Sequence, residues 1–473
     1  MWSRQNNQEP NLAGNVPAQG KSGNEVFVAT LAMGLIVTLW ALVAGPGGPA
    51  SKWFVGIPLI VPFLAMVLGM LTILAALWVH AVKAKSTVLR LATIAVTLVS
   101  LAVAAHDVYK LVRWDGILWI GDYLCRTAEL PDKTRPVDVC FCFVDHFEPE
   151  YAFRQTSQPS GPQQVELVEQ WEAAYRRAID GHADSDGRPP RHTWFFPIAL
   201  SSPQVRPVLA TWPGLGWGEI EYHLHHPIEF DDTQVRRQIV DDLAQLRQTG
   251  AVTSGYGFVH GMYGLAGGNR ACRSCYELDS LSETGCYADF TFPSIGSSAQ
   301  PAQANSVYYA QSTGKPKPYD RGIPAEAGKT SPGLLIVQGP LWARWPWITM
   351  DDADLRADNP PAPRRIDRWL AADIHVKGRP NWIFIVVHSH TAPEQNRKAI
   401  FGGAMQRTWQ ALEERFKRPG WRLHYVTTRE VCNIIKAAET GKDGNPGDYR
   451  DFLIAPPQNA KTPGRPGTGS WGY

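Results

Sequence analysis

The sequence has almost no excess of charge of either sign. Lysine and arginine number 46 and aspartate and glutamate 44, so the formal net charge of the 473-residue chain is only +2. This balance gives no electrostatic basis for binding nucleic acid, and we expect no nucleic-acid partner. The chain also lacks internal repeats and a clear linker between residues 137 and 449. One large domain is therefore the simplest prediction for this region, although its length would also permit two.

Charge is missing altogether from two long stretches near the N-terminus. Residues 26–45 and 54–79 contain no charged side chain, and each is long enough to cross a hydrocarbon layer that needs about 20 apolar residues. A third apolar run, residues 91–105, is shorter. It reaches spanning length if Arg90 and Lys110 extend their charged ends to the two interfaces. The sequence therefore predicts three transmembrane helices, with membrane lipid as a partner.

A cleaved signal peptide would also begin with basic residues and an apolar run. The later apolar runs argue against it, because a secretory leader has a shorter core and is not followed at once by more hydrophobic helices. The positive-inside rule places the more basic side of the membrane in the cytoplasm. Five basic residues lie on the side of the N-terminus and three on the other: Arg4, Lys21, Lys83, Lys85 and Arg90 against Lys52, Lys110 and Arg113.

We therefore expect a multi-pass protein of the plasma (inner) membrane whose C-terminal domain is extracytoplasmic, or periplasmic. If residues 91–105 do not cross, that domain lies in the cytoplasm instead. The predicted organisation is a polar tail over residues 1–24, a three-span anchor over 25–110, a connector over 111–135, an α/β domain of catalytic type over 136–449 and a Pro/Gly-rich tail over 450–473.

Short apolar runs alternate with amphipathic segments after residue 136. This alternation predicts a mainly parallel β-sheet covered by helices, either open or closed into a barrel. Strands are expected over residues 137–144, 193–200, 219–225, 254–260, 383–388 and 423–427. Helices are expected around the apolar stripes Val168, Trp171, Tyr175 and Ile179; Val235, Ile239, Leu243 and Leu246; Trp409, Leu412 and Phe416; and Val431, Ile434, Ile435 and Ala438.

Polar side chains stand where these predicted strands end. Active sites of parallel α/β folds lie at the carboxyl ends of the strands, so such residues could converge on one crevice. Seven of the thirteen histidines occupy these positions, together with two carboxylates. The strand-end residues are Asp145, His146 and Glu148; His223, His225 and His226; His260; and His388 and His390.

Imidazole nitrogens and a carboxylate are the usual ligands of a catalytic zinc ion. Such an ion makes a water molecule acidic, a carboxylate can take its proton, and a separate histidine can protonate the leaving group. Crowding in the segment EYHLHHP favours a metal site, since His223 and His225 share a face and His226 follows at the turn. The alternatives are a hydrogen-bonded structural role for His260 and a solvated turn for Asp145 and Glu148.

The order of motifs resembles that of the polysaccharide deacetylase superfamily, the NodB-like fold that includes carbohydrate esterase family 4. The segments that carry the resemblance are FVDHFEP, EIEYHLHH, GCYADFTFPS, WIFIVVHSHT and LHYVTTREV, over residues 137–441. The likeness is closer to an uncharacterised branch than to the well-studied deacetylases of that superfamily. It implies a deformed (β/α) barrel preceded by three transmembrane helices.

The resemblance also implies roles for individual residues. Asp145 matches the catalytic base, and His388 or His390 the histidine that protonates the leaving group. One metal ligand would be His146 or Glu148. The others would be His223 and either His225 or His226. The metal itself would be zinc, cobalt or nickel. In the third motif Pro293 is kept, but the usual Arg of the sugar groove is absent and Asp289 stands nearby. Asp289, Pro293 and His260 are the expected substrate-binding residues.

The function that follows is removal of an acyl group, most simply acetyl, from an envelope or exported polysaccharide. A polysaccharide substrate and the machinery of polysaccharide export are then the expected partners. Two alternatives remain open. Asp145, Glu148 and Asp289 could supply the carboxylate pair of a glycosidase on the same fold. A third possibility is a membrane-anchored component that binds or assembles glycans without catalysis.

The seven cysteines leave a separate question. Cys272, Cys275 and Cys286 lie close together in a polar region. Outside the cytoplasm they favour a disulfide, and inside it a metal knuckle, although three thiols are too few for four-ligand zinc or full pairing. Cys140 and Cys142 share one face of a predicted strand and are expected to be small buried hydrophobes. No cysteine is a candidate nucleophile.

Overall fold

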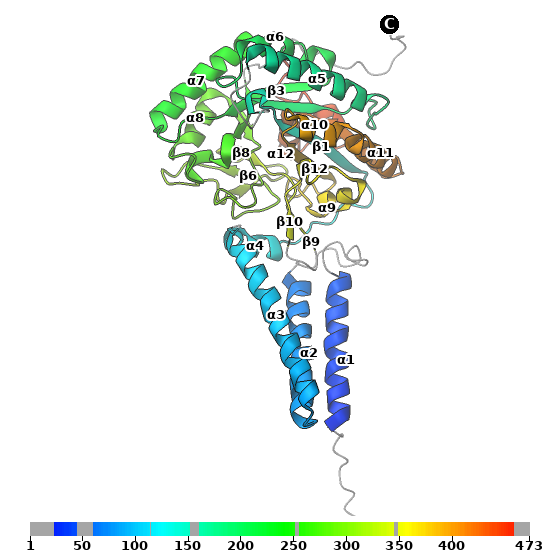
Figure 1. Cartoon of the computed structure of the whole chain (residues 1–473). Helices are drawn as coiled ribbons and strands as arrows, with labels where there is room; N and C mark the ends of the chain where they lie inside the picture. Colours follow the sequence, from blue (N-terminus) through cyan, green and yellow to red (C-terminus); the bar gives the residue numbers. More distant parts are fainter. Residues whose placement is uncertain are drawn as a thin grey trace, which may run out of the picture. The chain divides into compact units, whose positions relative to one another are not determined.

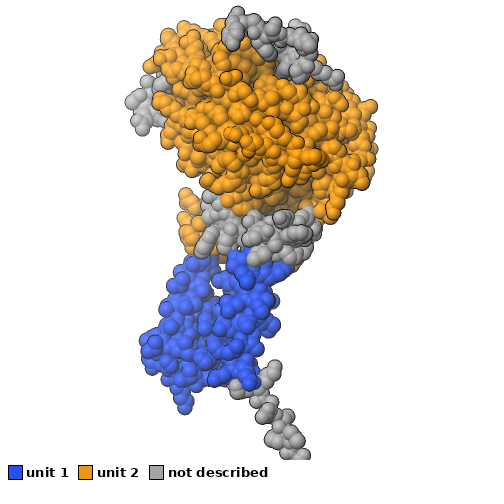
Figure 2. All heavy atoms as spheres, turned by 90° about the vertical axis from the view of Figure 1, so that its right-hand side faces the viewer, with its two compact units in different colours: residues 1–42, 62–104 blue, residues 43–61, 105–473 orange. Residues whose placement is uncertain are grey.

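The computed structural model describes residues 23–44, 60–113, 115–151, 160–250, 255–344 and 349–457. Residues 1–22 of the predicted N-terminal tail (1–24) and residues 458–473 of the predicted C-terminal tail (450–473) lie outside this range, as do residues 54–59 of the second predicted span. The chain divides into two compact units, one of residues 1–42 and 62–104 and one of residues 43–61 and 105–473 (Figure 2).

Three helices near the N-terminus are long and apolar enough to cross a membrane: α1 (Gly23–Ala44), α2 (Ile60–Lys83) and α3 (Thr87–Arg113). The helix α3 has 27 residues and so extends beyond the predicted run at both ends. Small residues bring α1 and α2 together, because a Cβ added to Gly34 would lie 3.0 Å from the Gly69 carbonyl oxygen. Arg90 joins α3 to α2 by donating to the carbonyls of Ala81 (3.2 Å) and Val82 (3.3 Å).

The second unit is built on a mainly parallel sheet, as predicted. Its order is β11-β12-β1-β2-β3-β4-β5-β8-β6-β7, with β13 also paired to β1, and only the pairings of β6 with β7 and β8 are antiparallel. The strands are β1 (Val137–His146), β2 (His192–Phe196), β3 (Gly218–Leu224), β4 (Tyr256–His260), β5 (Cys286–Asp289), β6 (Val307–Ala310), β7 (Ile323–Pro324), β8 (Leu334–Val337), β11 (Asp354–Leu355), β12 (Trp382–Ser389) and β13 (Trp421–Val426), with β9 (Trp342–Arg344) and β10 (Thr349–Asp351) forming a separate antiparallel pair.

The four predicted helical stripes lie in α5 (Gly161–Ile179), α7 (Asp232–Gln248), α11 (Ala404–Phe416) and α12 (Thr428–Glu439) (Figure 1). The helix α12 packs against β1, β4, β5 and β13, so the sheet curves around it. The remaining helices are α4 (Gly116–Cys125), α6 (Arg206–Leu209), α8 (Glu277–Thr284), α9 (Ile366–Ala371) and α10 (Glu394–Phe401). Short 3-10 turns are η2 (Pro149–Tyr151), η3 (Pro203–Val205), η4 (Pro213–Leu215), η5 (Gly261–Tyr263), η6 (Leu265–Gly267), η7 (Pro363–Arg365) and η8 (Pro446–Tyr449).

Two segments outside the predicted domain pack onto this unit. In α4, Trp119 and Tyr123 are buried against Ala304 and Leu341, so part of the predicted connector belongs to the folded unit. Residues 450–454 of the predicted C-terminal tail are also held, because the Asn433 side chain hydrogen-bonds to their backbone.

All ten residues of β1 are buried, and successive side chains enter different clusters. Phe141 and Phe143 join the cluster that includes side chains of α5 and α11, whereas Cys140 and Cys142 join the one that includes α12. The two cysteines are therefore buried small hydrophobes, as expected. Because side chains alternate along a strand, Asp145 and His146 at the end of β1 also face opposite sides.

Candidate metal centre

Parallel pairing brings the carboxyl ends of β1, β3, β4 and β12 to one edge of the sheet. In the register, His388 lies beside Val144, and His223 lies beside Val259. Glu148 follows the end of β1 by two residues. Strand-end side chains that are far apart in the sequence therefore meet at this edge, although they form two separate groups.

The first group consists of Glu148, His223 and His225, which we call the Glu148 centre. Glu148 Oε1 lies 3.1 Å from His223 Nε2 and 2.8 Å from His225 Nε2, and the two nitrogens are 3.1 Å apart. These atoms are close enough together to hold one metal ion. Two histidines and one glutamate form a donor set of catalytic zinc sites, which keep a further position open.

The backbone fixes which nitrogen of His223 can bind a cation. His223 Nδ1 lies 2.9 Å from the Val259 carbonyl oxygen, so Nδ1 carries the proton and donates it there. In the neutral ring, Nε2 then directs a lone pair at Glu148 Oε1. This arrangement, in which the outer nitrogen of a histidine is bound to a backbone carbonyl, is usual for metal-ligating histidines. The residues of the Glu148 centre therefore fit a divalent cation.

Burial sets the charges of this centre. It lowers the pKa of His223, because the charged ring would lose its hydration. Burial alone would raise the pKa of Glu148, but the adjacent His223 and His225 imidazoles hold it well below its usual range. The centre therefore presents a carboxylate and a neutral His223 imidazole to any cation.

Three more predicted histidines surround the centre. The ring of His146 lies 5.1 Å from that of His223 and 4.6 Å from that of His390, and His388 lies 6.0 Å from His146. His390 Nε2 is 3.9 Å from Glu148 Oε2, and its side chain is 31% exposed. Among these three, His390 is thus the one that both approaches Glu148 and reaches solvent.

His146 and His388 are buried, and Nε2 of each makes no hydrogen bond within the described residues. Burial, reinforced by His390 and other neighbouring histidines, lowers the pKa of His146 well below its usual range. Burial and the charge of His390 lower the pKa of His388 to about 4. Both rings are therefore neutral near pH 7 and offer unused nitrogen atoms to the centre.

Asp145, the predicted base, is not brought to the Glu148 centre. Its carboxylate lies on the other face of β1, where Oδ2 pairs with His192 Nε2 at 3.0 Å. Thr391 donates its backbone N–H to Oδ1 at 2.8 Å and its hydroxyl to Oδ2. His192 itself stacks on Phe143 and is fully buried. Asp145 therefore belongs to a buried hydrogen-bond network that is separate from the Glu148 centre.

His226 and His260 form the second group, apart from the Glu148 centre. Their Nε2 atoms are 3.3 Å apart, and both atoms lie near the thiol of Cys272. Of the two histidines between which the sequence could not choose, His225 therefore joins His223 and His226 does not. His260 is only 2% exposed, which limits its access to the predicted substrate.

Asp289 and Pro293, the other predicted substrate residues, are buried near the end of β5. The Asp289 carboxylate accepts from the Thr291 hydroxyl at 2.6 Å and from the Thr291 backbone N–H at 3.2 Å. Burial raises the pKa of Asp289 to about 7. Neither residue is presented to solvent, and their role in binding substrate stays a prediction.

Sequence reasoning missed two residues beside the centre. Asp354 of β11 lies next to His388 in the register, is buried, and has one carboxylate oxygen without a hydrogen bond. Tyr263 of η5 has its ring 6.4 Å from that of His146. The acidic run MDDAD at residues 350–354 was a usable signal for Asp354, whereas nothing in the sequence marks Tyr263.

A third group of candidate ligands, Asp184, Asp186 and His424, is already neutralised by protein charges. Arg450 binds both aspartates, at 2.9 and 2.7 Å, and His424 bridges Asp186 and Asp138 at 2.9 and 2.8 Å. Arg450 and His424 therefore neutralise these aspartates without a metal cation. The cysteines also form no disulfide, since all seven are free thiols.

No family model matches the chain, and no curated protein matches it at a significant level. Function is therefore inferred from the residues and their geometry.

Proposed function

We propose that this chain is a membrane-anchored, metal-dependent hydrolase that removes an acyl group, most simply acetyl, from a glycan. One observation carries the proposal: Glu148 Oε1, His223 Nε2 and His225 Nε2 lie within 3.1 Å of one another at the carboxyl edge of a parallel sheet. A divalent cation such as zinc, cobalt or nickel acts as a Lewis acid in such a site and makes water acidic near neutral pH.

The surrounding side chains divide the remaining work. His390 is the group that can exchange a proton with a reacting molecule, since its side chain reaches solvent and its Nε2 lies 3.9 Å from Glu148 Oε2. His390 protonates the leaving group in this proposal. His146 and His388 are buried and neutral, so neither adds a positive charge beside the cation. Asp145 is not assigned the role of the base. Its bonds to Thr391 connect β1 with the segment after β12 and so stabilise both.

The glycan substrate is supported by the motif order and by the three apolar helices. The positive-inside rule predicts that the second unit lies outside the plasma membrane, where exported polysaccharides are modified. Curvature of the sheet around α12 supports the deformed barrel that the resemblance implies. Protease added outside intact cells should then cleave a C-terminal tag, and protection of the tag would overturn this orientation.

A glycosidase receives less support from the geometry. Asp145 is bound on both oxygens by His192 and Thr391, and Asp289 is buried with Thr291. Neither is free to form a carboxylate pair with Glu148 across a sugar. The structure favours one carboxylate among histidines over two facing carboxylates.

Metal content and acyl release together test the proposal. The full chain, purified in detergent, should carry a divalent metal and release acetate from acetylated oligosaccharides. His223→Ala and Glu148→Gln should each lower the metal content and abolish release, whereas His375→Ala, a histidine elsewhere in the same unit, should leave both unchanged. Equal metal content in wild type and His223→Ala would overturn the metal centre. Metal binding without acyl release from any acetylated glycan would favour a binding or assembly role.

A further inference from the structure

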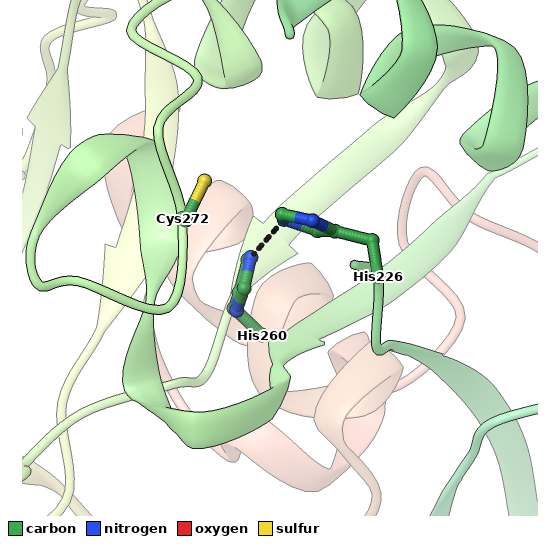
Figure 3. A group of neighbouring side chains, drawn as sticks. All are labelled: His226, His260 and Cys272. Carbon is green, nitrogen blue, oxygen red and sulfur yellow. Dashed lines mark hydrogen bonds between the residues drawn. The ribbon is translucent and has the colours of Figure 1, made fainter. Parts of the chain in front are cut away.

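A second cluster of metal-ligating side chains lies beyond the Glu148 centre. His226 follows β3, His260 ends β4, Cys272 lies in the loop after η6, and Glu277 begins α8. Figure 3 shows the two imidazoles and the thiol converging on one space. The ligand atoms of His226, His260 and Cys272 all lie within 4.8 Å of one another. Glu277 adds Oε1 at 3.5 Å from His260 Nε2 and Oε2 at 3.7 Å from Cys272 Sγ.

Both histidines are fixed in the tautomer that a metal requires. His260 Nδ1 donates to the Gly261 carbonyl at 2.5 Å, and His226 Nδ1 donates to the Pro227 carbonyl at 2.8 Å. The Nε2 atoms of the two neutral rings therefore face each other at 3.3 Å with lone pairs and no proton between them. Two acceptors at that distance repel unless a cation lies between them.

Glu277 gives an independent sign of a missing partner. Its side chain is fully buried, and Oε1 makes no hydrogen bond to any residue that the structure describes, while Oε2 accepts from the Ala266 backbone N–H at 2.6 Å. A buried carboxylate oxygen without a partner is costly, and native proteins rarely leave one. Oε1 is directed at the Nε2 atom of His260, which has a lone pair of its own.

We propose that His226, His260, Cys272 and Glu277 form a second metal site, a closed structural site for Zn²⁺. Two imidazoles, one thiolate and one carboxylate supply the four ligands of a tetrahedral zinc ion. The thiolate disfavours Ca²⁺ and Mg²⁺, which prefer oxygen ligands. His260, Cys272 and Glu277 are at most 3% exposed and His226 is partly buried, so protein encloses most of the site, as in structural zinc sites.

The site would hold the loop that lines the Glu148 centre. This loop leaves β4 through Met262, Tyr263 and Ala266, three residues other than glycine with φ of 54°, 58° and 43°. Such conformations cost free energy and persist only where the surroundings enforce them. Tyr263 approaches His146, and the loop therefore forms part of the wall of the Glu148 centre. A metal ion that joins β3, β4 and α8 fixes the position of this wall.

Metal counting on the full chain in detergent tests the second site separately from the first. Wild type should bind two zinc ions. Cys272→Ser and Glu148→Gln should each bind one, and the double variant none. Cys275→Ser is the matched control, because Cys275 lies three residues from Cys272 and its Sγ contacts the Arg273 backbone carbonyl; it should bind two. Equal zinc content in wild type and Cys272→Ser would overturn the proposal.

Replacement of zinc by Co²⁺ gives a readout that does not depend on a variant folding. The cobalt form of the wild type should show a thiolate-to-cobalt charge-transfer band in the near ultraviolet. Glu148→Gln should keep this band, because Glu148 belongs to the other centre. The band in the wild type does not depend on the proposed hydrolase activity. Absence of the band from fully loaded wild type, or its loss in Cys275→Ser with retention in Cys272→Ser, would overturn the assignment of Cys272.

Discussion

Asp145 and His146 are neighbours at the end of β1, yet they lie in contrasting surroundings. On the face of Asp145, His192 and Thr391 satisfy both carboxylate oxygens in a buried network. On the face of His146, imidazoles crowd around Glu148, and Nε2 of His146 has no hydrogen bond in the described part of the chain. Saturated polar groups specify the fold, whereas converging lone pairs lower stability until something binds them. We therefore expect the first face to be structural, and the second is the face for which we propose a function.

His390→Gln should produce the largest effect on the functional face. Loss of a positioned proton donor lowers kcat by about 10²- to 10⁴-fold. Metal content and the urea midpoint should stay close to those of wild type, because His390 is the most exposed histidine around the centre and is not one of the three proposed ligands. The measurement is acetate release under saturating substrate. An unchanged kcat would show that another group protonates the leaving group.

Asp145→Ala should have its effect on stability instead. The substitution leaves His192 and Thr391 buried without their shared acceptor, and breaking a buried pair costs about 3–5 kcal/mol. Urea unfolding of the full chain in detergent, followed by tryptophan fluorescence, measures the loss. Variant protein that is still folded should keep its metal. Loss of metal with unchanged stability would reverse the roles given to the two faces.

Gly261→Ala tests how closely the loop after β4 supports the Glu148 centre. A Cβ at this position would lie 2.6 Å from His225 Nε2, so the ring must move. Displacing a ligand in this way should weaken metal binding by about 10- to 100-fold, the range seen when support of a ligand is lost. Competition with a chelating dye measures it.

Gly121→Ala in α4 is the control for that substitution, because its added Cβ meets no atom within 4 Å. The control should bind metal as wild type does. Equal affinity in Gly261→Ala and Gly121→Ala would show that the loop does not position His225.

His388 should make a smaller, pH-dependent contribution to stability. Its pKa is about 4 in the folded protein, against an ordinary value of 6.5. Between these values the unfolded chain binds more protons at this position. The stabilising contribution is therefore complete above about pH 6.5 and is lost as the pH falls toward about 4. His388→Gln should reduce the fall in urea midpoint between about pH 7 and about pH 5.

His375→Gln provides a control of opposite sign. Burial alone would lower the pKa of His375, but the hydrogen bond to Asp373 and the negative charge of Asp373 together raise it, so this residue stabilises the folded state most at low pH. Its replacement should increase the fall in urea midpoint over the same interval. The same pH dependence in both variants would contradict the two assignments.

Much of the fold follows from local pattern. The three apolar helices, the mainly parallel sheet and the four helices with apolar stripes were all predicted, because hydrophobic periodicity reports directly on burial. The meeting of strand-end histidines followed from parallel topology. The boundaries were harder to predict, since α4 and residues 450–454 are polar in part and are ordered by contacts with Leu341 and Asn433 that are remote in sequence.

The division of the site was decided by tertiary structure. His225 and His226 are adjacent in the sequence, and only the turn after β3 sends one to Glu148 and the other to His260. Alternation along β1 separates Asp145 from His146, but which face receives the metal ligands depends on where β3 and β12 lie. The sequence by itself determined that this protein has three apolar helices and histidines at strand ends, because both follow from residues near in the chain. Which histidines share a centre was decided only in the folded protein, because those contacts join segments about 75 residues apart.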